Sequence, residues 1–278
     1  MGQPPLVERG GEVRTMKVSR CNFNFLFLFI IGFCVVSFFG CASLGVYNAA
    51  TGRNEFIFIP TDSEVAMGHD IHQKLINQYS LADKQQQWTR LKRIGNRLAQ
   101  VSDRQDYEYH FYLLENSELN AFTTPGGNVY VFTGLMDKLK TDDQIAAVLA
   151  HEIGHCAARH TIKKFQAALG YNLIEGIVFS QLEGQDQVKQ VAALSTGVVM
   201  NLIFSSYSRR DESEADRLGV KYMYLAGFDL NGMIETLEIL KKESKPDHVS
   251  LSLRTHPYLD DRIVAVKKEV EKVKAQEP

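Results

Sequence analysis

The sequence has little proline, little net charge and no internal repeat. Its 278 residues include 7 prolines and 20 glycines, which excludes collagen-like and proline-rich linker architectures. Lys and Arg total 31 against 33 Asp and Glu, so the formal net charge is −2 and the sequence argues against a generic nucleic-acid binder. No period of about 20–50 residues is visible, which argues against a solenoid appendage. With 45% hydrophobic and 23% charged residues, the composition is that of a globular protein.

Charge is absent from residues 21–40, which follow Lys17 and Arg20 and are mostly apolar. A basic flank, an apolar stretch of about 7–15 residues and a small residue at its exit are typical of a secretory signal peptide. A membrane-spanning helix usually needs about 20 apolar residues. The sequence therefore predicts a signal peptide of the lipoprotein type over residues 1–40, with an uncleaved anchor as the alternative. Met16 is an alternative start, because a short basic segment leads from it directly into the apolar run.

Cysteine is scarce, with four in the chain. The apolar run ends in Gly-Cys-Ala-Ser, which resembles the lipobox of bacterial lipoproteins and makes Cys41 the predicted lipidation site. An ordinary signal peptide that ends near a cysteine is the alternative. Residues 41–60 are then a tether. Cys21 and Cys34 lie in the part expected to be removed, so Cys156 is left alone and an internal disulfide is excluded even in an exported compartment.

Hydrophobic periodicity predicts a mainly helical α+β fold after residue 60. Helices are expected from residue 61 and over 84–101, 141–169, 171–207, 211–226, 231–243 and 257–274. Short strands are expected over 107–111, 119–123 and 129–133, with a turn at 125–128. Residues 191–207 carry no charge. They are interpreted as a buried core helix or a mobile flap over a cleft, with membrane contact as the alternative.

The motif His151-Glu152-Ile-Gly-His155 carries chemistry. On a helix, the two histidines are four residues apart and project from one face, where both imidazoles can bind one metal ion. Glu152 can reach a water on that metal, as in the H-E-x-x-H metalloproteases. The other faces of this helix are apolar, and a buried helix would not bury two imidazoles without a function. Cys156 is the next residue and points about 100° away, so it is predicted to be a small core residue and not a ligand.

A catalytic zinc site needs a third protein ligand and an open position. The longer motif with a third histidine is absent, because position 161 is Thr and His160 is one residue out of register. Glu212 and Asp216 are four residues apart on a later predicted helix. We expect Glu212 to bind the metal and Asp216 to support a ligating histidine from behind. Glu214 lies on a different face of that helix and is interpreted as a solvated charge.

Four motifs in order resemble metallopeptidase family forty-eight, a gluzincin group that includes prenyl-protein, mitochondrial and bacterial periplasmic proteases. They are HEIGH, the E-x-x-x-D of residues 212–216, Thr-His-Pro at 255–257 with Arg262, and NAFTTPGGNVYVFTGL at 120–135. The similarity covers about residues 55–275. It implies a zincin-like metallopeptidase domain over 61–278, with a small sheet packed on the HExxH helix and one Zn²⁺ per chain. Convincing spanning helices of the integral-membrane members are not visible, which argues against prenyl-protein substrates.

The expected mechanism has Glu152 as general base, which takes a proton from a metal-activated water and returns it to the leaving amine. His256 is predicted either to stabilise the oxyanion or to gate the open metal position, with a plain helix start as the alternative. Arg262 is interpreted as the structural partner of a carboxylate, with oxyanion stabilisation as the alternative. The strand at 128–133 is predicted to be the edge to which a substrate adds as an extra strand.

The sequence thus predicts a zinc metalloendopeptidase anchored to a bacterial membrane as a lipoprotein. Its expected substrates are unfolded or misassembled envelope proteins, since pairing at a strand edge reads backbone more than side chains. The expected location is the periplasmic side of the outer membrane, with inner-membrane anchoring as the alternative. Partners are protein substrates and the membrane, but not nucleic acid. A proteolytically silent chaperone or assembly lipoprotein is the alternative function, and a zinc hydrolase of non-peptide amides is a third.

Overall fold

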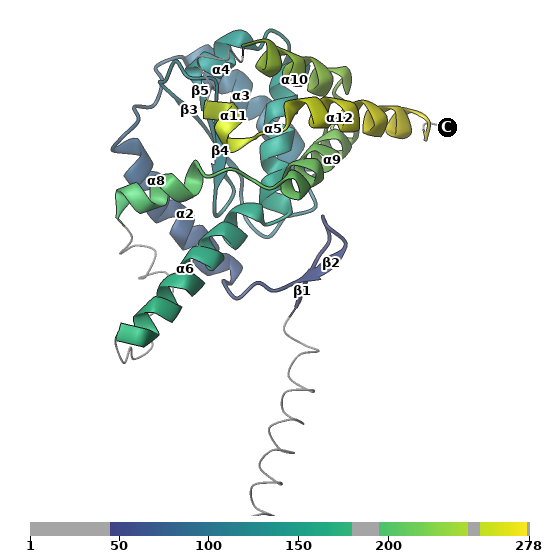
Figure 1. Cartoon of the computed structure of the whole chain (residues 1–278). Helices are drawn as coiled ribbons and strands as arrows, with labels where there is room; N and C mark the ends of the chain where they lie inside the picture. Colours follow the sequence, from purple (N-terminus) through teal and green to yellow (C-terminus); the bar gives the residue numbers. More distant parts are fainter. Residues whose placement is uncertain (1–44, 180–194, 244–250, 277–278) are drawn as a thin grey trace, which may run out of the picture. The chain divides into compact units, whose positions relative to one another are not determined.

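The computed structural model describes residues 45–179, 195–243 and 251–276; the predicted signal peptide and Cys41 lie outside these ranges. Helices predominate, which confirms the predicted α+β, mainly helical class (Figure 1). The helices are α2 (Thr61–Ile76), α3 (Gln85–Ala99), α4 (Thr133–Lys138), α5 (Asp142–Ala157), α6 (His160–Phe179), α8 (Thr196–Ile203), α9 (Arg209–Leu225), α10 (Asn231–Glu243), α11 (Leu251–Thr255) and α12 (Leu259–Lys274). The strands are β1 (Val46–Asn48), β2 (Arg53–Glu55), β3 (His110–Leu114), β4 (Ala121–Thr124) and β5 (Asn128–Phe132).

The larger sheet has three strands in the order β3-β5-β4, with β3 parallel and β4 antiparallel to β5. Gly126 and Gly127, both with φ of 78°, make the predicted turn between β4 and β5, because residues with a Cβ rarely adopt this conformation. The prediction of an edge strand at 128–133 is wrong, since β5 is hydrogen-bonded on both sides. The edge beside α5 is β4. Strand β3 also begins at His110, later than predicted, where its pairing with β5 starts.

Helix α5 runs between α3, α9, α10 and β4, and all its residues from Gln144 onward are buried. It begins with a capping box, in which the Gln144 N–H donates to Thr141 Oγ1 at 3.1 Å. The prediction of one helix to residue 169 is wrong. Arg159 has φ of 59°, so the chain breaks after Ala157 and a new helix, α6, starts at His160.

A close contact between α5 and α9 depends on Gly154. A Cβ at this position would lie 2.7 Å from the Ala215 carbonyl oxygen, so any larger residue would push the two helices apart. Helix α9 starts with a capping box formed by Ser208 and Asp211. This fixes the first turn of α9, which carries Glu212, against the histidines of α5.

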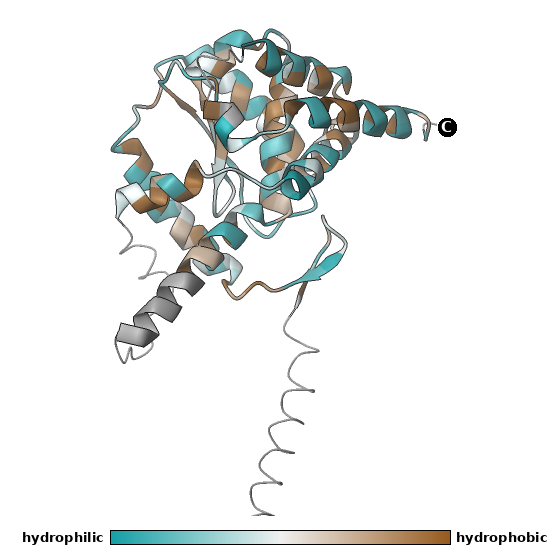
Figure 2. Cartoon of the chain, viewed as in Figure 1, coloured by the Kyte–Doolittle hydropathy of each residue, from teal (hydrophilic) through white to brown (hydrophobic). Residues whose placement is uncertain are grey.

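Helices α10 and α12 cover the core next to α5 and α9. Each alternates between hydrophobic and hydrophilic residues along its length, as expected for a helix that buries one stripe (Figure 2). In α12 the residues Ile263, Val266 and Val270 lie on one stripe and are buried, and Val273 on the same stripe is partly buried. The sequence pattern therefore specifies which face of α12 packs inward.

Two strands lie inside the predicted tether. Strands β1 and β2 pair as a hairpin, and the compact unit of the chain begins at Val46. Asn48 Nδ2 donates to the Ala157 carbonyl oxygen at 3.1 Å, and Arg217 Nη2 donates to that of Ala50 at 3.1 Å. The hairpin is therefore held to the end of α5 and to α9.

Part of the charge-free segment 191–207 forms α8, which buries Val199 and Ile203 and packs against α6 and β4. Only these two residues of α8 are buried and Val198 is 41% exposed, so the prediction of a buried core helix is wrong for α8, which is a surface helix with one inward face. The helix also ends at Ile203, before the predicted residue 207, and residues 191–194 lie outside the described ranges. In the ranges that the structure describes, we find no helix both long enough and apolar enough to cross a membrane.

Candidate metal centre and active site

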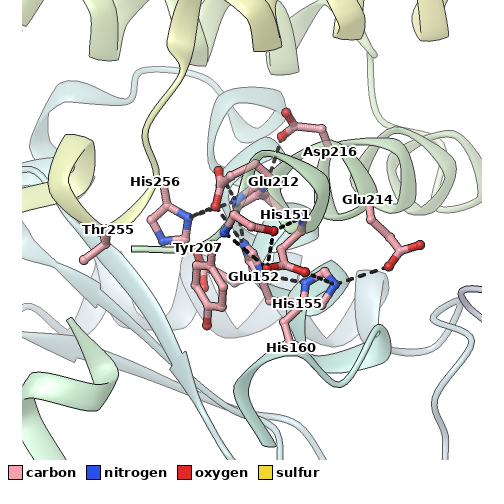
Figure 3. A network of polar contacts seen from close by, with 12 residues as sticks. His151, Glu152, His155, His160, Tyr207, Glu212, Glu214, Asp216, Thr255 and His256 are labelled. Carbon is pink, nitrogen blue, oxygen red and sulfur yellow. Dashed lines mark hydrogen bonds and ion pairs between the residues drawn. The ribbon is translucent and has the colours of Figure 1, made fainter. Parts of the chain in front are cut away.

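Four buried side chains converge on one point. His151 and His155 come from α5, Glu212 from α9 and His256 from the segment between α11 and α12 (Figure 3). One ligand atom from each lies within 4.8 Å of the others. The structure thus brings the predicted metal ligands together, with His256, predicted to act at the open metal position or the oxyanion, in the same cluster.

The spacing of these atoms fits a single metal ion. His151 Nε2 lies 3.1 Å from His155 Nε2 and 3.2 Å from His256 Nδ1. Glu212 Oε1 lies 3.5 Å from His155 Nε2 and 3.0 Å from His256 Nδ1. Two ligands of a tetrahedral zinc ion with bonds of about 2.0–2.2 Å are about 3.3–3.6 Å apart. Imidazole nitrogen and carboxylate oxygen are also ligands that zinc takes.

Buried atoms without hydrogen-bond partners beside this cluster also indicate that it binds a metal ion. Glu152 Oε2 and His256 Nε2 are buried and have no hydrogen-bond partner in the described part of the chain. Glu152 Oε1 lies 3.5 Å from His256 Nε2. Buried polar atoms are rarely left unpaired in folded proteins, because each costs free energy. These two therefore mark the side of the cluster where a group from outside the chain fits.

Asp216 and Arg262 support the cluster from behind. His151 Nδ1 lies 2.8 Å from Asp216 Oδ1, and Arg262 Nε donates to Asp216 Oδ2 at 2.8 Å. Arg262 Nη1 also lies 2.6 Å from Glu212 Oε2 in an ion pair that lacks hydrogen-bond geometry. Arg262 thus lies against two carboxylates, in the structural position expected for it. It holds together the carboxylate next to His151 and the carboxylate in the cluster.

The charges in the cluster suit metal binding. Burial would raise the pKa of the Glu212 carboxyl, but Arg262 and His256 outweigh burial and hold that pKa well below its usual value. Burial lowers the pKa of the His155 imidazole well below its usual value. Glu212 is therefore ionised and His155 neutral near pH 7. These are the protonation states in which both groups bind a metal ion.

Two polar residues beside His155 differ from what the sequence indicated. Glu214 was interpreted as a solvated charge, and this is wrong. Its side chain is 9% exposed and accepts a hydrogen bond from Arg53 Nη2 at 2.8 Å. His160, out of register for a ligand, has its Nδ1 2.9 Å from His155 Nδ1. No sequence spacing reveals this contact, because the break at Arg159 turns α6 back toward α5.

Tyr207 and Cys156 complete the surroundings. The Tyr207 ring stacks on His155 with centroids 3.9 Å apart, and its hydroxyl lies 3.2 Å from Thr161 Oγ1. Cys156 is buried with Sγ 2.8 Å from Thr123 Oγ1, and burial raises the pKa of its thiol to about 12. The thiol is therefore protonated at neutral pH, as expected for a core residue.

A mostly apolar cavity opens next to His151 and Glu152. It is small, with a cavity volume of about 40 Å³. The apolar walls come from β4, α4, α5 and α10 and are formed by Ala121, Leu135, Ala147, Val148, Met233, Leu237 and Leu240. The cavity therefore joins the polar cluster to a site for an apolar side chain.

Comparison with known proteins identifies the family of this arrangement. The model of peptidase family M48 matches residues 85–270. The chain is 29% identical over 188 residues to the mitochondrial metalloendopeptidase OMA1 of Schizosaccharomyces pombe, which covers 66% of this chain and 54% of that protein. It is 31% identical over 180 residues to the beta-barrel assembly-enhancing protease of Yersinia pestis, covering 61% of this chain and 36% of that protein.

A shorter relative is metalloprotease LoiP of Escherichia coli, 32% identical over 155 residues, or 55% of this chain and 59% of that protein. The chain thus spans between 36% and 59% of the length of these three relatives. The match to the family model covers most of the helices and the three-stranded sheet, and it includes all four residues of the cluster. The chain belongs to peptidase family M48, as its motifs predicted.

Proposed function

We propose that the chain is a zinc-dependent endopeptidase. The observation that carries this proposal is the set of four buried ligand atoms within 4.8 Å of one another, beside Glu152 Oε2, which has no hydrogen-bond partner among the described residues. His151, His155 and Glu212 are the proposed ligands of one zinc ion per chain. A zinc ion held there would supply Lewis acidity, which lowers the pKa of water to about 7 and polarises the scissile carbonyl.

The residues of the chain then have separate tasks. Glu152 Oε2 accepts a proton from the attacking water and returns it to the leaving amine nitrogen. Asp216 accepts a hydrogen bond from His151 Nδ1–H, which keeps the proton on Nδ1 and leaves the lone pair of Nε2 for the metal. Arg262 keeps the Asp216 carboxylate in place through two hydrogen bonds. Arg262 is thus a positioning residue, and its guanidinium is occupied by carboxylates.

We propose that substrates are extended, unfolded chains. In the described part of the chain, β4 is the terminal strand of the sheet and packs against α5, and backbone pairing with β4 would select for a segment without its own secondary structure. An apolar side chain next to the scissile bond would enter the cavity beside Glu152. Folded proteins rarely offer both an extended backbone and an accessible apolar side chain, so the site favours unfolded ones.

The apolar cavity is expected to set which residue lies next to the cleaved bond. Val148→Phe places a larger side chain in the cavity wall, so we expect cleavage beside Leu and Met to fall by about tenfold or more, from the 1–3 kcal/mol that pocket contacts contribute. Cleavage beside Ala should change little. Mass spectrometry of a digested peptide library measures both. Val264→Phe, at an exposed position of α12, is the matched control, and equal shifts in the two variants would refute the role of the cavity.

His256 is the proposed gate of the metal position. Its Nδ1 lies within the ligand cluster, so it competes with water for the fourth position, which a third imidazole fits well. His256→Ala should therefore raise casein cleavage with the zinc content unchanged. If His256 stabilises the oxyanion instead, the same variant would lower turnover by about a hundredfold or more with zinc retained. Unchanged activity and zinc content would reduce His256 to a helix start.

Membrane attachment is proposed to depend on Cys41. Two relatives are bacterial proteins, the beta-barrel assembly-enhancing protease and metalloprotease LoiP, and the first is named for enhancing beta-barrel assembly. We expect Cys41 to incorporate a labelled fatty acid in growing cells and the chain to fractionate with membranes. Cys41→Ala should abolish the label. Label that persists in Cys41→Ala would refute lipoprotein anchoring at this residue.

An experiment in cells separates the protease from a silent chaperone lipoprotein. Proteomes are compared between cells with the wild type and cells with Glu152→Gln. A protease of envelope proteins predicts that intact envelope proteins accumulate in Glu152→Gln and that defined cleavage products disappear. Identical proteomes would favour the chaperone or scaffold. Changes confined to small amides would favour a hydrolase of non-peptide substrates.

A further inference from the structure

His155 has a row of polar partners on the side away from the ligand cluster. Its Nδ1 lies 2.9 Å from His160 Nδ1. His160 Nε2 lies 3.3 Å from Glu214 Oε2. The same carboxylate oxygen accepts a hydrogen bond from Arg53 Nη2 at 2.8 Å. Figure 3 shows Glu214 on the helix of Glu212, reaching the side of the cluster away from His256.

Metal binding by His155 fixes the direction of these hydrogen bonds. A ligating Nε2 must present its lone pair, so the ring proton of His155 is on Nδ1. That proton is donated to the lone pair of His160 Nδ1. His160 then carries its own proton on Nε2 and donates it to Glu214. Each atom in the row has the role that its neighbour requires, and the row ends on an ionised carboxylate.

The end of the row is anchored by the β1–β2 hairpin. Burial would raise the pKa of Glu214, but the hydrogen bonds from His160 and Arg53 outweigh it and lower that pKa to about 2. His160 is 2% exposed and Glu214 9%, so water does not substitute for either partner. Arg53 is 40% exposed and closes the row at the surface. His151 has the corresponding support from Asp216 and Arg262.

We propose that His160 and Glu214 are positioning residues that orient His155 for the metal, and that Arg53 ties them to the N-terminal hairpin. The inference rests on the proposed zinc site. It extends that site through the hairpin to the segment that follows the predicted lipid anchor. The hairpin therefore helps to orient a metal ligand, because its Arg53 holds the carboxylate of Glu214.

Two substitutions of His160 test the orientation. The amide oxygen of a glutamine can accept a hydrogen bond from His155 Nδ1–H, and its amide nitrogen can donate one to Glu214. Leucine is similar in size but can do neither. We expect His160→Leu to weaken zinc binding by about 10- to 100-fold, the usual loss for such outer partners, and His160→Gln to restore most of it. Affinity is measured by competition with a chromogenic chelator on the full mature chain. Thermal unfolding of the zinc-free forms checks that each variant is folded.

Substitutions of Arg53 and Arg217 test the hairpin. Both arginines join it to α9, but Arg217 contacts the Ala50 carbonyl oxygen and does not touch the row. Arg53→Gln should weaken zinc binding by a few-fold, less than His160→Leu because Arg53 is partly solvated. Arg217→Gln should leave it unchanged.

The outcomes separate this inference from the proposed function. Zinc bound by the wild type and equally tightly by folded His160→Leu would overturn the positioning role while leaving the zinc site intact. Equal losses of zinc affinity in His160→Gln and His160→Leu would show that hydrogen bonding by residue 160 does not affect zinc binding. This result would also overturn the positioning role. A wild type that binds no zinc would refute the proposed function itself.

Discussion

Glu152→Gln is expected to retain one zinc ion per chain and to lose about 10²–10⁴-fold of its kcat on unfolded casein. Glutamine has nearly the shape of glutamate but cannot accept a proton at neutral pH. The metal ligands are other residues, and Glu152 Oε2 has no hydrogen-bond partner in the described part of the chain, so the substitution should leave the cluster intact. Steady-state kinetics and metal analysis of the same preparation measure both quantities.

A matched control makes this result specific. Glu238→Gln makes the same chemical change at an exposed position of α10, where the carboxylate pairs with Lys267. It should have wild-type activity and zinc content. Wild-type casein cleavage by Glu152→Gln would show that another group is the base. Loss of zinc together with activity would show that Glu152 holds the metal.

Glu212→Gln is expected to lose the bound zinc and, with it, nearly all peptidase activity. A neutral amide is a much weaker ligand than a carboxylate, and Glu212 is the one carboxylate among the four converging side chains. The buried Arg262 keeps Asp216 as an ion partner, so the chain should still fold. Zinc content after dialysis and circular dichroism test the two parts of this expectation.

The critical outcome is whether Glu212→Gln or Glu214→Gln loses more of the bound zinc. Glu214→Gln should weaken zinc binding through His160 but should retain far more zinc than Glu212→Gln. The reverse order would mean that the wrong carboxylate has been assigned to the metal. Glu238→Gln serves again as the control, because it removes a carboxylate outside both groups.

The helix that carries the motif was predictable from local chemistry. Thr141 and Gln144 form a capping box that the sequence spells out, and the spacing of His151 and His155 follows from helix geometry alone. The spacing of Glu212 and Asp216 likewise identified the face of α9 that meets α5. These features depend on a few residues close together in the chain, so periodicity and caps reveal them.

The parts that were not predictable depend on backbone geometry and long-range pairing. The order β3-β5-β4 puts a late strand in the middle of the sheet, which no strand pattern specifies. The left-handed conformation of Arg159 ends α5 and turns His160 toward His155. From its position on the helix alone, Glu214 is expected to be a solvated surface charge. In the structure the hairpin places Arg53 against it. Contacts between residues far apart in sequence therefore built the outer part of the site.

The most direct test of the central claim is a comparison of one substrate in two states. A reduced and carboxymethylated protein and its native, disulfide-bonded form are incubated with the mature chain, then again after zinc removal by a chelator and after zinc is added back. We expect cleavage of the unfolded form alone, loss of that cleavage without zinc and its recovery when zinc is returned. Glu152→Gln should cleave neither form under any of these conditions. Cleavage that survives zinc removal, or that is equally fast on the native form, would contradict it.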